Sequence, residues 1–257
     1  MSEERVAQKE KTVGFLLSER GLTSSALASR LGVSRTTALK VLNSLIEKGS
    51  AEKQGVEYVL SDGVAAVILR IGSKGGEIIG YSLRDRVIAR QELEFSDMLS
   101  YNDNLLGLCG YADRYSDHLK KKYKRFFLCM IVDALTPFAV GLPSCFSLKA
   151  TRNDLIAEAL KREHGDAAVL YVGSYDNALL ICSDGKAIAP AKTAVDDMAA
   201  GLGEILKLVC PQLVALDGEL PEAEKICAVR GISLLKMSDG SGLHLDEREM
   251  LIKALSL

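Results

Sequence analysis

Two amphipathic segments with a glycine between them constrain this chain more than any other feature. Their spacing predicts two short helices, over Ser24–Leu31 and over residues 35–48, joined by a tight turn. Gly32 supplies the turn, and Ser34 is suited to cap the free amides of the second helix. The apolar residues that fall at helical spacing, and that we expect to face a core, are Leu27, Leu31, Ala38, Val41, Leu42 and Leu45.

The opposite face of the second segment carries short polar and cationic side chains, which suit the base edges and phosphates of a DNA major groove. An apolar helical segment over residues 6–17 precedes the pair. Two strand-like segments, residues 51–53 and 56–60, follow it around a Gln-Gly turn. This order predicts a winged-helix DNA-binding domain over residues 1–62, acting on a double-stranded operator. The candidate DNA contacts are Ser34, Arg35, Thr36, Thr37, Lys40, Asn43 and, on the hairpin, Lys53.

The charge balance gives no general attraction to nucleic acid. The chain has 257 residues and a net charge of −2, and residues 1–62 hold nine Lys/Arg against eight Asp/Glu, a balance of +1. DNA affinity must then come from local placement of cations. Because a single domain of this charge would bind weakly, we expect a homodimer that reads a palindromic site.

The composition predicts a reduced, cytoplasmic protein. None of the six cysteines forms a Cys-x-x-Cys pair, and Cys129, Cys182 and Cys210 lie in apolar runs, where a thiol is usually a small buried hydrophobe. The first residues have no apolar targeting segment, and no apolar run is long enough to span a membrane.

Beyond residue 62 the chain contains the same order of elements twice. A strand, a second strand, a helix and a further strand are predicted in each half, which indicates two related lobes, residues 63–146 and 147–257. In the first lobe the predicted strands form an antiparallel meander over residues 64–71, 77–83 and 87–95, followed by a helix over residues 102–122 and a buried strand over residues 126–132. In the second lobe the predicted elements are helices at 153–162, 194–210, 222–230 and 246–255 and strands at 168–173, 178–182, 212–216 and 232–236.

Residues 151–160, TRNDLIAEAL, resemble the NDxxxxAL stretch of the ROK family of sugar-responsive repressors and sugar kinases. Together with the segment 1–62 and the two lobes, the resemblance covers nearly the whole chain. It implies a mixed α/β fold, in which a winged helix precedes a shortened, two-lobed actin-like (ribonuclease H-like) domain. In kinases of the family the aspartate of this motif takes a proton from the sugar hydroxyl, and Asp154 occupies that position.

The chain departs from the family where phosphate and metal would bind. Residues 169–188 are similar to the second phosphate hairpin, but Tyr175 and its neighbours replace the glycines of the turn. Residues 208–218 are similar to the run before the nucleotide-side glycines, with Asp217 in place of one of them. Arg70 stands where the kinases have a metal-associated aspartate, and the cysteine cluster of the family's zinc site is missing.

These differences predict a protein that binds neither ATP–magnesium nor zinc and uses no cofactor. The candidate contacts for a small neutral or anionic effector are Arg70, Asn153, Asp154, Tyr175 and Asp217. The sequence therefore favours a transcription regulator, most simply a repressor, with a catalytically inactive sensor and dimerisation region. Two alternatives stay open: an active sugar kinase with a DNA-binding appendage, and lobes that act only as a dimer scaffold. The lysine run at residues 120–124 is interpreted as the solvated end of a helix, with a nucleic-acid patch as its alternative.

Overall fold

The computed structural model divides into two compact units. The first comprises Met1–Thr151 together with Met250–Leu257, and the second comprises Arg152–Glu249. The residues that the structure describes are 3–19, 21–72, 74–83, 86–132, 145–165, 169–172, 178–181, 187–188, 202–203, 206–207, 211–216, 222–236 and 244–257. Within these residues, no helix combines the length and the apolar character that crossing a membrane requires.

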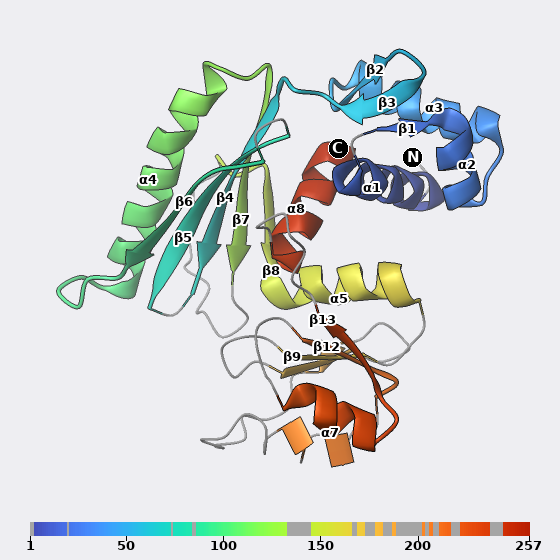
Figure 1. Ribbon diagram of the computed structural model, residues 1–257. Helices are drawn as coiled ribbons and strands as arrows, with labels where there is room; N and C mark the ends of the chain where they lie inside the picture. The colour runs from blue at the N-terminus through green and yellow to red at the C-terminus, as the bar shows by residue number, and fades with distance from the viewer. Residues whose placement is uncertain are drawn as a thin grey trace. The chain divides into compact units, whose positions relative to one another are not determined.

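The first unit begins with three helices and a small antiparallel sheet (Figure 1). The elements are α1 (Glu3–Ser18), β1 (Leu22–Thr23), α2 (Ser24–Leu31), α3 (Arg35–Glu47), β2 (Ala51–Gln54) and β3 (Glu57–Leu60). The sheet order is β1-β3-β2, with Leu22 opposite Tyr58. The helices and the hairpin lie where the sequence predicts them. Strand β1 was not predicted, because two residues carry no periodicity.

The second part of the first unit is a five-stranded sheet with a long helix on one face. Its elements are β4 (Val64–Ile71), β5 (Gly75–Ser82), β6 (Arg86–Glu94), α4 (Tyr101–Lys120), β7 (Arg125–Val132) and β8 (Leu148–Thr151). The strand order is β6-β5-β4-β7-β8. The first three strands form the predicted antiparallel meander, and β7 joins β4 in parallel.

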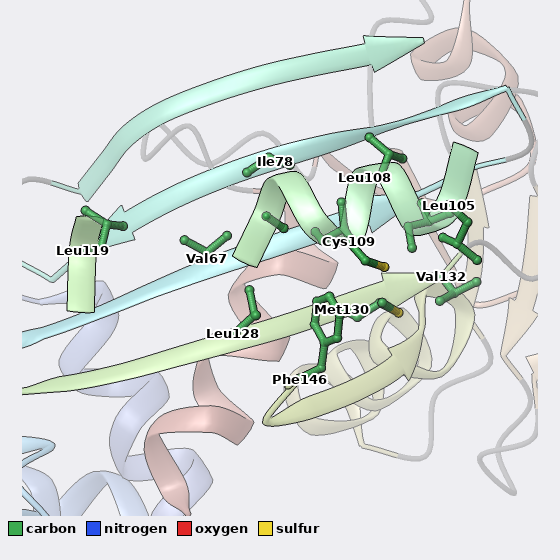
Figure 2. Close-up of a cluster of buried hydrophobic side chains, with 13 residues drawn as sticks. Val67, Ile78, Leu105, Leu108, Cys109, Leu119, Leu128, Met130, Val132 and Phe146 are labelled. Atoms are coloured by element: carbon green, nitrogen blue, oxygen red, sulfur yellow. The ribbon is translucent and has the colours of Figure 1, made fainter. Parts of the chain in front are cut away.

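Helix α4 covers the sheet through alternate strand residues, because successive side chains of a strand point to opposite faces (Figure 2). Val67 of β4 and Leu128 of β7 belong to the same buried cluster as Leu105, Leu108 and Leu119 of α4. Gly80 lies under α4 at a point of close approach, since a Cβ there would be 2.5 Å from the Tyr115 hydroxyl.

The second unit repeats the same strand topology. Its described elements are α5 (Arg152–His164), β9 (Val169–Val172), β10 (Ala178–Ile181), β11 (Ala187–Ile188), β12 (Leu213–Leu216), α7 (Ala223–Val229) and β13 (Ser233–Lys236). The order β11-β10-β9-β12-β13 matches β6-β5-β4-β7-β8, with antiparallel and parallel pairings in the same places. The predicted duplication is therefore present in the sheets. Most of the predicted helix over residues 194–210 lies outside the described residues.

Helix α8 (Leu245–Ser256) begins in the second unit and ends in the first. Its first turns are held by ion pairs, with Asp246 3.3 Å from Arg152 and Glu249 bonded to Arg162 at 2.6 Å. The sequence assigned residues 147–257 to the second lobe, whereas residues 147–151, which include β8, and residues 250–257 group with the first unit. Strand β8 does so because it pairs with β7. For residues 250–257 the reason is packing against the N-terminal helices, since a Cβ on Gly14 would touch Ile252 at 3.4 Å.

Candidate nucleic-acid interface

The turn between α2 and α3 is closed by capping interactions at both ends. Gly32 has φ of 65°, a left-handed conformation that favours glycine, and its N–H bonds back to α2. Ser34 has extended backbone, and its hydroxyl accepts from the Thr37 amide at 3.1 Å. The local signals in the sequence thus set the angle at which α3 leaves the turn.

Helix α3 has one buried and one exposed face. The buried residues are Ala38, Val41, Leu42 and Leu45, as the sequence predicts. Among the candidate contacts, Ser34, Arg35, Thr36, Lys40 and Asn43 are exposed and Thr37 is half-buried. The exposed face therefore presents hydroxyl, amide and cationic groups along the helix, which are the groups that contact base edges and phosphates.

Arg35 makes a contact that sequence reasoning missed. Its Nε donates to the hydroxyl of Ser24 at 3.2 Å, and Ser24 is buried at the start of α2. The bond links the first residue of α3 to the first residue of α2. Ser24 falls on the same helical face as Leu27 and Ala28, which predicts its burial but not its partner.

Lys53 is exposed on β2, where it pairs with the buried Tyr58 of β3, and its ammonium lies 5.9 Å from the centre of the Tyr58 ring. The hairpin turns at Gly55, where φ is 62°, and Val56 at the tip is 76% exposed. The hairpin therefore carries a partly oriented cation at its side and an apolar tip.

The end of α3 is joined to the five-stranded sheet by a polar network around the buried Ser50 hydroxyl. Arg125, at the start of β7, donates to the Lys48 carbonyl at 2.7 Å and also to the Ser50 hydroxyl. The Ser50 hydroxyl in turn donates to the Leu255 carbonyl at 2.8 Å. Burial lowers the pKa of Arg125, but a guanidinium stays protonated, so the network places a cation at the C-terminal end of α3, where it is favourable. These partners are far apart in sequence, and no local signal predicts them.

The candidate effector contacts are distributed over both units. Arg70, on β4 of the first unit, lies 3.6 Å from the Glu77 carboxylate, which also binds Arg90 at 2.8 Å. Asn153 and Asp154 lie in the first turn of α5 in the second unit. Tyr175 and Asp217 lie outside the described residues. Arg70 thus has a carboxylate partner on the neighbouring strand β5, which the sequence did not predict. Its role toward an effector stays a prediction.

Cys109 and Cys129 are buried in the first unit. Burial raises the pKa of Cys109 to about 11 and that of Cys129 to about 12, so both thiols stay protonated near neutral pH and are poor nucleophiles. The predicted burial of Cys129 is confirmed, while Cys182 and Cys210 lie outside the described residues. In the described part of the chain, no three His, Cys, Asp or Glu side chains gather as metal ligands would.

No protein-family model matches the chain, and no curated protein matches it. A solved ROK family transcriptional regulator, a homologue of the E. coli MLC protein, is similar over 97% of each chain, with 10% identity and a TM-score of 0.60. The likeness shows a shared fold. The chain thus has the mixed α/β fold of that regulator, and the ROK-like fold that the motifs implied is supported.

Two further solved structures are more distant. The inorganic polyphosphate/ATP-glucomannokinase of Arthrobacter sp. strain KM matches 74% of this chain and 98% of its own, with 10% identity and a TM-score of 0.45. A ROK family protein from Streptococcus pneumoniae TIGR4, solved with sucrose, matches 73% and 96%, with 11% identity and a TM-score of 0.40. At this distance neither bears on the activity of this chain.

Proposed function

We propose that this protein is a DNA-binding transcription regulator, and that residues 1–62 form a winged helix that reads an operator. The observation that carries the proposal is the exposed face of α3. This helix is capped at Ser34 and packed on its apolar side, and it leaves Thr36, Lys40 and Asn43 in solvent. The shared fold with a ROK family transcriptional regulator supports the same function.

In this proposal α3 enters the major groove from its N-terminal end. Asn43 has the amide pair that can bond an adenine edge, and Arg35 has a guanidinium, bonded through Nε to Ser24, that can contact a guanine or a phosphate. Lys53 on the hairpin contacts the backbone beside the groove. Two copies of the chain on a palindrome supply the affinity that one weakly charged domain lacks.

We also propose that the lobes do not transfer phosphate and instead provide dimerisation and a site for a small effector. The ion pair between Arg70 and Glu77 supports this proposal, because it places a guanidinium at the position where the resemblance expects a magnesium-associated aspartate. Phosphoryl transfer relies on a magnesium ion that bridges the phosphates, and a guanidinium in place of its carboxylate partner repels that ion.

DNA binding is tested by selecting bound fragments from the source genome with the purified protein, then measuring affinity for the selected duplex by fluorescence anisotropy. We expect Lys40→Ala and Asn43→Ala each to weaken binding, by about 1–3 kcal/mol for a residue that reads a base. Lys74→Ala and Asn102→Ala are matched controls at exposed positions outside the domain and should leave binding unchanged. Specific binding that survives deletion of residues 1–62 would refute the assignment.

The kinase alternative is tested separately. Calorimetric titration with ATP and magnesium should give no heat, and a coupled assay on common hexoses should give no turnover. Turnover that disappears in Asp154→Asn would restore the kinase reading, because this carboxylate is the base that the resemblance implies.

A further inference from the structure

A second cationic surface lies outside residues 1–62, in the connection between α4 and β7. We name residues 121–125 the basic loop: Lys121, Lys122, Tyr123, Lys124 and Arg125. Lys120, just before it, is engaged by Asp113 at 3.6 Å and Asp117 at 3.2 Å. In contrast, Lys121, Lys122 and Lys124 are exposed, and none of the three has an ion-pair partner among the described residues.

The fold brings the basic loop next to the N-terminal helices and hairpin. The Arg125 amide donates to the Gly63 carbonyl at 3.0 Å, and a Cβ on Gly63 would lie 3.6 Å from the Lys124 side chain. In Figure 1 the loop runs beside the connection from β3 to β4. Gly63 lies three residues beyond the end of β3, so Lys124 stands near the base of the hairpin, and Lys121 and Lys122 precede it in the same loop.

Arg125 also fixes the basic loop relative to α3. Its guanidinium binds the Lys48 carbonyl at the end of α3 and the Ser50 hydroxyl at the start of β2, and it stacks 4.8 Å from the centre of the Phe127 ring. The loop therefore does not depend on a flexible linker for its position near α3. A loop whose backbone is already held in place loses less conformational entropy when it binds a partner.

The positive charge of the basic loop favours binding to a polyanion. Three exposed ammonium groups within four residues repel one another, and a partner with closely spaced negative charges relieves that repulsion. Double-stranded DNA carries one phosphate charge per about 1.7 Å of helix axis. The N-terminal domain has a balance of only +1, so three more cations at its edge would change its attraction to DNA substantially.

We propose that the basic loop is a second DNA-contact surface, in which Lys121, Lys122 and Lys124 bind the phosphate backbone flanking the groove that α3 occupies. This inference rests on the proposed DNA-binding function and extends it to residues of the first lobe. Lysine contacts to phosphate carry no sequence information, so the loop contributes affinity and α3 contributes specificity. It also revises the interpretation of this lysine run as a merely solvated helix end.

The test is the salt dependence of DNA binding by the full chain. Affinity is measured by anisotropy between about 50 and 200 mM salt, on the genome-selected duplex and on a random one, because each phosphate contact contributes about 0.9 to the slope of log affinity against log salt. The variant Lys121→Ala/Lys122→Ala/Lys124→Ala should lower that slope by roughly 2–3 and weaken binding to both duplexes by the same factor. The control variant Lys74→Ala/Lys161→Ala/Lys225→Ala makes the same charge change at exposed positions elsewhere and should keep the slope.

The outcomes separate this inference from the proposed function. If the wild-type chain binds the selected duplex and the two triple variants have equal slopes, the basic loop is not a DNA contact while the function stands. If the loop variant weakens only the selected duplex, the lysines are not phosphate contacts and the inference also fails. If the wild-type chain binds no DNA, the proposed function fails and this inference fails with it. Circular dichroism melting of both variants checks that each is folded.

Discussion

At the level of a single residue, Ser34 caps α3 and is also exposed on the side that the proposed function turns toward DNA. Replacing it with alanine removes the bond to the Thr37 amide, and we expect the free energy of unfolding to fall by about 1 kcal/mol in urea titration. Ser25→Ala, at an exposed position of α2, is the control and should change stability little.

A second substitution separates the two roles of Ser34. Aspartate also caps helices well, so Ser34→Asp should keep the stability of the wild type. Its negative charge faces phosphate in the proposed complex, so the same variant should lose DNA affinity. A Ser34→Asp variant that binds DNA as tightly as the wild type would place Ser34 away from the backbone.

The lowered pKa of Lys9 predicts that the stability of the fold depends on pH. It is buried in α1, and its pKa is lowered from 10.5 by burial first, then by Lys48 and Arg5, with Glu47 opposing. Because the folded pKa lies below the unfolded one, the unfolded state holds the proton more tightly. Protonated Lys9 therefore destabilises the fold at neutral pH, and the penalty disappears as pH rises from the lowered pKa toward 10.5.

We accordingly expect Lys9→Met to have a higher free energy of unfolding than the wild type at neutral pH. The difference between the two proteins should become smaller as the pH approaches 10.5, as measured by urea unfolding across that range. Lys11→Met, at an exposed position of the same helix, should show no such narrowing. If the free energy of unfolding of Lys9→Met exceeded that of the wild type by the same amount at all pH values, the added stability would come from apolar packing alone.

At the level of elements, the polar network around the buried Ser50 hydroxyl ties α3, β7 and α8 together. Ser50→Ala leaves the Leu255 carbonyl and one Arg125 N–H without this partner, which should cost about 1–3 kcal/mol. Ser116 is equally buried, but its hydroxyl bonds only to the Asp113 carbonyl in its own helix. Ser116→Ala should cost less in the same urea titration. Equal losses would mean that the link between the three elements adds nothing beyond an ordinary buried hydroxyl.

At the scale of the whole molecule, the same five-stranded sheet topology occurs twice, once in each unit. Three helices and a small sheet precede the first of these sheets in the sequence. On the proposal that the lobes provide dimerisation, light scattering at micromolar concentration should give a mass of twice 27.7 kDa, with or without operator DNA. A monomer under both conditions would contradict the homodimer and would leave the affinity of a weakly charged domain unexplained.

The sequence by itself determined the local structure and the repeat. The turn at Gly32 and the cap at Ser34 depend only on adjacent residues, so they form independently of the rest of the fold. The apolar periodicity of α3 determines which of its faces is buried. The repeated order of strands and helices was sufficient to predict two related lobes, and the sheets have the same topology. The candidate contacts on α3 follow from the same periodicity, which explains why most of them are exposed, with Thr37 half-buried.

Only the tertiary structure decided which distant groups meet. Arg125 lies 77 residues from Lys48 and Ser50 lies 205 from Leu255, and no local pattern encodes such pairs. The same applies to Arg70, whose partner Glu77 depends on strand register, and to the basic loop, whose position beside the hairpin depends on how β4 and β7 pair. Side-chain partners arise from packing over the whole unit, whereas helix caps and turns arise from a few adjacent residues.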